Sequence, residues 1–164
     1  MDQKLSGPPL FSFVLAAVMA VASSAALAQA CSENTLEIRN NGVKAQFNIE
    51  IARSTAEQAQ GLMFREDMPQ FDGMLFVYDR PHRVSFWMKN TLIPLDMLFV
   101  DETGLVKRIH SNAVPLDETP IFGGDGVQYV LEINGGLANL LNLTEGAEMR
   151  YSGISQENAV WPCE

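Results

Sequence analysis

The sequence is poor in metal-ligating and in basic side chains. Its 164 residues include two cysteines and two histidines, too few for a standard Cys/His zinc site, so we expect no metal. Eleven lysines and arginines stand against twenty aspartates and glutamates, which gives a net charge of −9. A chain of this charge repels phosphate backbones, so we expect no nucleic-acid partner.

Motifs that identify a reaction from spacing alone are also missing. The sequence has no G-x-S-x-G, H-E-x-x-H, P-loop or C-x-x-C pattern. The GGDG run at residues 123–126 precedes an expected strand and offers one carboxylate, which favours a flexible turn over a phosphate or calcium loop. Five methionines between Met63 and Met97 lie mostly in strand patterns, which favours core packing over Cu(I) binding. No cofactor is therefore expected.

The first thirty residues have the features of a signal peptide. Residues 10–22 (LFSFVLAAVMAVA) carry no charge and are shorter than the ~20 residues of a membrane span. Residues 28–30 (AQA) then form an A-x-A cleavage site. This pattern predicts cleavage before Cys31 and a periplasmic or secreted protein, with residues 31–164 as a single domain and no stable membrane span after cleavage. An uncleaved anchor and a lipid anchor on Cys31 are the alternatives.

Both cysteines lie at the ends of the mature chain. Cys31 follows the cleavage site, and Cys163 is the penultimate residue. Two lone cysteines in an oxidising compartment predict one disulfide that joins the chain ends. Two free thiols, or a lipidated Cys31 with Cys163 unpaired, are the alternatives.

Dense turn signals between short apolar runs indicate a mainly β fold. Ser54-x-x-Glu57 is a capping box that begins a short helix, and residues 136–142 form a second one. Expected strands cover residues 35–39, 43–52, 74–78, 84–90, 95–100, 105–110, 127–133 and 147–151. The sequence thus predicts one compact β-sandwich or distorted barrel of roughly eight strands with two short helices.

The candidate site lies in residues 84–97, which we expect to form a hairpin. Strand alternation places Trp87 and Lys89 together on the face opposite Phe86 and Met88. An indole beside an ammonium suits a small polar ligand. Asp96 interrupts an apolar strand and needs a partner, for which Lys89 is the nearest candidate across the turn. The pair is then either functional or only structural.

Two further side chains complete the candidate ligand-binding set, which is Arg65, Trp87, Lys89, Asn90 and Asp96. Arg65 follows the first helix, where a guanidinium pairs with Glu57 or holds an anion. No catalytic residue is assigned.

Four sequence blocks resemble the family called domain of unknown function 192. They are EQAQGLMFR at residues 57–65, GMLFV at 73–77, FWMKNTLIPLD at 86–96, and VLE at 130–132 with a following Gly-Gly pair. The likeness extends over residues 43–151. It implies a compact, mostly β domain that is often exported in bacteria, and it implies no reaction.

Three functions are consistent with these observations. The first is a non-catalytic periplasmic module that binds a small polar ligand or an envelope polymer. The second is a hydrolase-type enzyme with Asp96 or Glu132 as acid or base and Lys89 as a stabilising charge. The lack of an evident nucleophile with its base leans against this enzyme. The third is a scaffold or chaperone-like protein, which requires a broad exposed apolar patch. Oligomeric state stays open.

Overall fold

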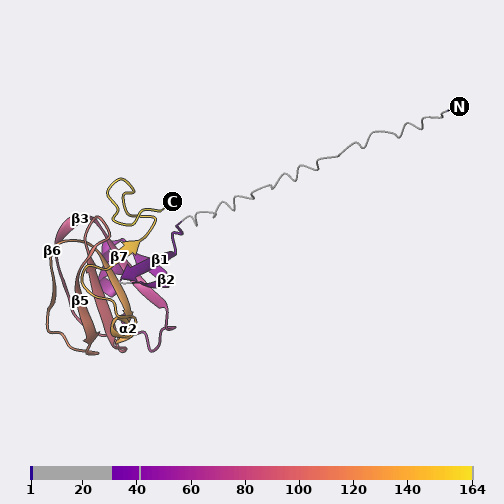
Figure 1. Ribbon diagram of the computed structural model, residues 1–164. Helices are drawn as coiled ribbons and strands as arrows, with labels where there is room; N and C mark the ends of the chain where they lie inside the picture. Colours follow the sequence, from indigo (N-terminus) through magenta and orange to yellow (C-terminus); the bar gives the residue numbers. More distant parts are fainter. Residues whose placement is uncertain (2–30, 41, 164) are drawn as a thin grey trace.

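The computed structural model describes Met1 and residues 31–40 and 42–163 (Figure 1). The structure therefore does not describe the predicted signal peptide beyond Met1, and the AQA cleavage site at residues 28–30 lies outside the described residues. No helix in the described part is long and apolar enough to cross a bilayer.

Seven strands form a single sheet in the order β5-β4-β6-β3-β2-β1-β7. The strands are β1 Thr35–Asn40, β2 Val43–Ala52, β3 Asp72–Phe86, β4 Leu95–Val100, β5 Val106–Ala113, β6 Ile121–Asn134 and β7 Glu148–Arg150. All neighbouring strands are antiparallel except β2 and β3, which are parallel and are connected through α1, Thr55–Gln60. A second helix, α2, covers Leu137–Leu140. The prediction of a mainly β fold with two short helices is confirmed.

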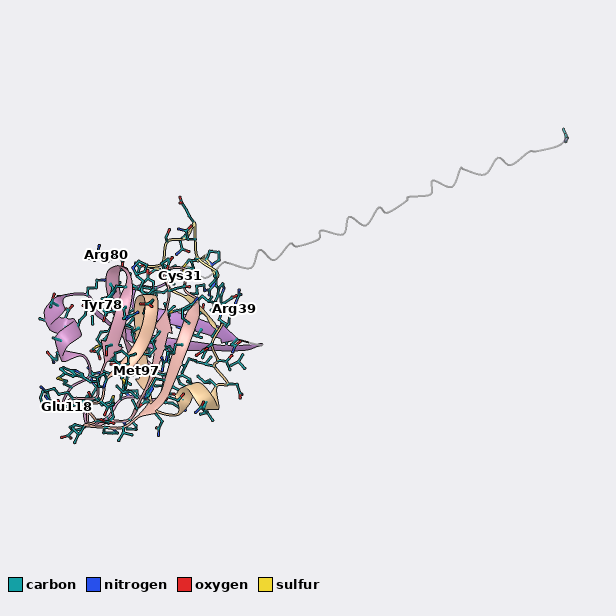
Figure 2. All side chains as sticks on the ribbon, turned by 90° about the vertical axis from the view of Figure 1, so that its left-hand side faces the viewer. Cys31, Arg39, Tyr78, Arg80, Met97 and Glu118 are labelled. Atoms are coloured by element: carbon teal, nitrogen blue, oxygen red, sulfur yellow. A yellow bond between two sulfur atoms is a disulfide. The ribbon has the colours of Figure 1, made fainter. Side chains whose placement is uncertain are left out.

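The sheet curls until its two edges touch (Figure 2). Leu105, just before β5, forms an isolated bridge with Glu148 of β7. Beside it the Met149 N–H donates to the Gly104 carbonyl at 2.7 Å. Large apolar side chains such as Phe47 and Leu131 fill the inside of the curl, and Leu137 of α2 packs against them. Of the two predicted architectures, this is the distorted barrel.

A second apolar cluster covers the outer face of the same sheet. It contains four of the five clustered methionines, namely Met68, Met74, Met88 and Met97. Leu62, from the turn after α1, packs into this cluster with them. In the view of Figure 2, α1 and α2 lie on opposite sides of the sheet. The thioethers fill a core, as the strand pattern predicts.

The expected eighth strand is absent because β3 is continuous. Residues 74–78 and 84–90 were predicted as separate strands, but β3 runs without interruption from Asp72 to Phe86, with irregular register opposite β6 beyond Val77. β6 likewise begins at Ile121, so the GGDG run at 123–126 lies inside a strand and the prediction of a flexible turn is wrong. A Cβ on Gly123 would lie 2.2 Å from the Phe99 ring, so only glycine fits at this crossing of strands.

Residues 84–97 do not form a hairpin. β6 lies between β3 and β4 in the sheet, so the segment from Trp87 to Pro94 is a crossover loop and not a turn between paired strands. The alternation of burial still holds at its start, where Val84 and Met88 are buried and Trp87 is exposed.

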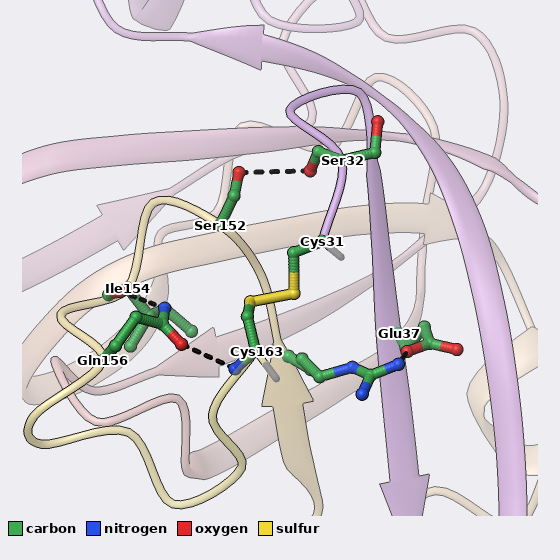
Figure 3. The surroundings of a disulfide bond; sticks show 8 residues. Cys31, Ser32, Glu37, Ser152, Ile154, Gln156 and Cys163 are labelled. Carbon is green, nitrogen blue, oxygen red and sulfur yellow. Dashed lines mark hydrogen bonds and ion pairs between the residues drawn. A yellow bond between two sulfur atoms is a disulfide. The ribbon is translucent and has the colours of Figure 1, made fainter. Parts of the chain in front are cut away.

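Cys31 and Cys163 form a disulfide, as their positions in the sequence predict (Figure 3). Their Cα atoms lie 5.6 Å apart, although 132 residues separate them in sequence. Nearby, the Ser152 hydroxyl donates to the Ser32 carbonyl at 3.1 Å. The segment after β7 is thereby held against the beginning of β1.

Candidate functional site

A pocket of about 110 Å³ lies between α1 and the outer face of the sheet, and we call it the α1 pocket. Residues 58–63, from α1 and the turn after it, form one wall. The opposite wall carries four aromatic rings, those of Phe76, Tyr78, Phe86 and Trp87. Glu132 of β6 also lines the space. The pocket is therefore lined by aromatic rings, by polar side chains such as those of Gln58 and Ser85, and by one carboxyl group.

The sequence around α1 explains why residues 58–63 pack close to the sheet. Ser54 accepts a hydrogen bond from the Glu57 N–H at 3.2 Å, and the Glu57 carboxylate accepts one from the Ser54 N–H at 2.8 Å. This capping box fixes where the helix begins, as predicted. Gly61 ends the helix with φ +49°, and a Cβ there would lie 3.2 Å from Phe76 Cζ and 4.0 Å from a Glu132 carboxylate oxygen. Glycine thus lets the backbone approach the carboxyl group.

Glu132 is a buried acid without a partner. Its neighbours along β6, Leu131 and Ile133, point into the curl, so alternation turns Glu132 to the outer face. Its partners in register on the flanking strands are Met74 and Met97, which offer no charge. The residue is 4% exposed, and within residues 31–40 and 42–163 no hydrogen bond or ion pair reaches its side chain.

Burial raises the pKa of Glu132 to about 8, because the apolar surroundings disfavour the charged carboxylate. Burial also raises the pKa of Tyr78 to about 12, with a smaller contribution from the negative charge of Glu132. At neutral pH the pocket therefore holds a carboxylic acid and a phenol, both protonated. A group that brings positive charge into the pocket would favour ionisation of the acid.

Three of the five predicted ligand-binding residues lie at the edge of this pocket. Trp87 lines it and keeps 49% of its surface exposed. Lys89 Nζ lies 5.3 Å from the centre of the Trp87 ring, so the two side chains are neighbours, as predicted. The Asn90 amide lies 3.8 Å from Met63 Sδ, another lining atom.

Arg65 is engaged elsewhere. Its guanidinium donates two hydrogen bonds to the Glu50 carboxylate on β2, at 2.5 and 2.9 Å. These bonds lower the pKa of Glu50. Glu57, the partner considered from the sequence, is instead occupied by the capping box.

Asp96 does not pair with Lys89, and that prediction is wrong. Its carboxylate accepts hydrogen bonds from the backbone N–H groups of Asn112 at 2.6 Å, Gly136 at 2.9 Å and Ala138 at 2.6 Å. It is fully buried beside the beginning of α2 and does not line the α1 pocket. The strand order separates the two residues, because β6 lies between β3 and β4. Asp96 is a structural acid that fixes α2 to the sheet.

Sequence reasoning considered Glu132 only as the acid or base of an enzyme and overlooked the rings around it. One signal was available, since Glu132 is a single acid within the apolar run Val130 to Ile133. The wall of Phe76 and Tyr78 was not visible, because these residues read only as a buried strand.

The comparisons with known proteins agree on the fold. The model of the DUF192 family, described as uncharacterized ACR, matches residues 36–151. A protein of unknown function from Novosphingobium aromaticivorans is 43% identical, with a TM-score of 0.68 over 70% of this chain and 82% of that one. A “putative transcription regulator” from Sinorhizobium meliloti is 35% identical, with a TM-score of 0.70 over 74% of this chain and 95% of that one. No curated protein matches the chain.

Proposed function

The chain belongs to the DUF192 family, whose members share a fold but have no assigned reaction, so we propose its function from the α1 pocket. The protein is an exported, non-catalytic module that binds a small polar ligand. The ligand is a free molecule or the end of an envelope polymer. One observation carries the proposal. The carboxyl group of Glu132 is buried at the pocket and has no partner among the residues that the structure describes. A buried polar group without a partner costs free energy, which a ligand recovers when it supplies one.

The composition of the walls supports binding. Ligand sites combine aromatic side chains with polar groups that fix orientation, and the α1 pocket offers both. Trp87 adds a half-exposed indole at the edge, the kind of side chain on which binding energy concentrates.

The same pocket gives less support to the hydrolase alternative. A carboxyl group with a pKa of about 8 is suited to proton transfer near neutral pH. Hydrolysis by a covalent route also needs an activated nucleophile. Of the lining hydroxyls, that of Thr91 donates to the Lys89 carbonyl, and that of Ser85 has no hydrogen bond to a base within residues 31–40 and 42–163. Asp96, the other proposed acid, is committed to three backbone N–H groups away from the pocket. Binding without turnover is therefore favoured.

Export is part of the proposal. A disulfide between Cys31 and Cys163 persists in an oxidising compartment such as the periplasm, which supports the signal peptide inferred for residues 1–30. The net charge of −9 supports a role away from nucleic acid, whatever the regulator from Sinorhizobium meliloti does.

A thermal-shift screen with periplasmic metabolites and cell-wall fragments tests this function. A true ligand raises the melting temperature of the wild type, because it binds the native state only. It should also raise that of Glu145→Gln, which makes the same substitution at an exposed site, but have much less effect on Glu132→Gln. A ligand that stabilises all three proteins equally, or one that is chemically converted during incubation, would contradict the proposal.

A further inference from the structure

We propose that the α1 pocket recognises an organic ammonium group, which the carboxyl group of Glu132 and the surrounding aromatic rings hold together. This inference rests on the proposed binding function and specifies its ligand class. Carboxylates and aromatic faces both attract cations.

Within residues 31–40 and 42–163, no side chain provides a cation to this carboxyl group. Arg65, near the pocket, is bound to Glu50, and Arg53 donates to the Tyr151 hydroxyl at 3.1 Å. Lys89 lies over Trp87 and is not among the lining residues. When Glu132 ionises, a cationic ligand supplies the positive charge that the described residues do not.

The other groups that line the space are neutral. Tyr78, on β3, is protonated at physiological pH. On α1, the Gln58 amide donates to the Val77 carbonyl at 3.0 Å and is already engaged. On β4 and on the other side of β6, the register partners of Glu132 are Met97 and Met74. Glu132 is thus the charge-determining group of the pocket.

Aromatic rings border the space in more than one orientation. Phe76 and Phe86 meet edge to face, with centroids 5.0 Å apart, so two differently oriented rings border the same space. The Trp87 ring already attracts one ammonium, that of Lys89, at 5.3 Å. Aromatic rings beside a carboxyl group are the usual means by which proteins bind quaternary and other substituted ammonium groups.

The size of the pocket distinguishes an organic cation from a metal ion. Its 110 Å³ correspond to the liquid volume of about four waters, enough for a head group of four or five heavy atoms. A calcium ion needs about six to eight oxygen ligands, and a single carboxyl group does not supply them. The remainder of a longer ligand would leave past the exposed Trp87 side chain.

Choline and its uncharged isostere 3,3-dimethylbutan-1-ol test the inference on the wild-type protein. The two probes have nearly the same shape and differ in the positive charge. Binding is followed by calorimetry and by the indole NMR signal of Trp87, which Trp161→Phe distinguishes from the second indole. We expect choline to bind at least tenfold more tightly than the isostere.

The pH dependence provides a second readout. The cation needs an ionised Glu132, so choline affinity should rise about 100-fold from pH 6 to pH 9, because two pH units separate pH 6 from a pKa of about 8. Glu132→Gln should abolish this rise, and Glu145→Gln should retain it. Dispersed NMR spectra verify that the variants are folded.

Each outcome is decisive. Tighter binding of choline with the expected rise supports the inference. Equal or tighter binding of the neutral isostere overturns the ammonium inference and leaves the binding function intact. If neither probe shifts the Trp87 signal, the ammonium inference is wrong, and the metabolite screen alone then decides the proposed function.

Discussion

Glu132→Gln is expected to remove a large pH dependence from the stability of the protein. In the folded protein the pKa of Glu132 is about 8, against an ordinary value of 4.5. Between these two values the folded state keeps the proton and the unfolded state releases it. The free energy of unfolding of the wild type therefore falls with rising pH, by about 1.4 kcal/mol per unit. The decrease reaches about 5 kcal/mol near pH 8 and then stops.

The variant has a neutral amide of the same shape and does not lose this free energy. Relative to the wild type, Glu132→Gln should thus gain about 4 kcal/mol of stability between pH 5 and pH 8. Urea denaturation at pH 5, 6, 7, 8 and 9, with the disulfide intact, measures the difference. All other titrating groups are common to both proteins and cancel. Glu145→Gln is the matched control, because it removes an exposed carboxylate and should run parallel to the wild type.

A constant difference between Glu132→Gln and the wild type across this range would refute the reasoning. It would mean that the carboxyl group is solvated or paired in the folded protein, and the observation behind both proposals would be lost. A difference that grows in the opposite direction would show a carboxylate stabilised by a cation.

Three further predictions follow from the described contacts. Reduction of the Cys31–Cys163 disulfide, which closes a loop of 132 residues, should lower the free energy of unfolding by up to ~4–5 kcal/mol. A melting temperature that reductant leaves unchanged would contradict this stabilisation. Thiol titration of the unfolded, unreduced protein should find no free sulfhydryl. Asp96→Ala should cost about 3–5 kcal/mol because it leaves three backbone N–H groups, that of buried Ala138 among them, without their acceptor, whereas Lys89→Ala should cost less than about 1 kcal/mol. Equal costs in urea denaturation would argue for a coupled pair. Mass measurement of the protein made in a Gram-negative host should show the loss of residues 1–30 and no lipid on Cys31; an intact or acylated N-terminus would refute this.

Features with a local cause could be predicted from the sequence. The capping box needs only Ser54 and Glu57, three residues apart, and it forms as expected. β2 follows the period of two between Val43 and Ala52. The disulfide also follows from composition, because the sequence has two cysteines and offers one possible pair.

Features that depend on strand order could not be predicted in the same way. Residues 84–97 have the pattern of a hairpin, but β6, formed 25 and more residues later, inserts between the two strands. This insertion separates Lys89 from Asp96 and gives Asp96 its backbone partners near α2. It also places Glu132 between Met74 and Met97, where the acid has no partner. The sequence pattern therefore identified Trp87, at the edge of the pocket, and not Glu132, at its centre.

The Cys31–Cys163 bridge determines how the domain bears mechanical load. The two Cα atoms are 5.6 Å apart, so a load applied at Cys31 and at Cys163 acts at nearly the same point of the domain. Tension applied between these two residues passes through one covalent sulfur–sulfur bond and bypasses the hydrogen bonds of β1 and β7. A force applied between Cys31 and Cys163 therefore leaves the strands of the oxidised protein unloaded. In the reduced protein the same force acts on β1 and β7.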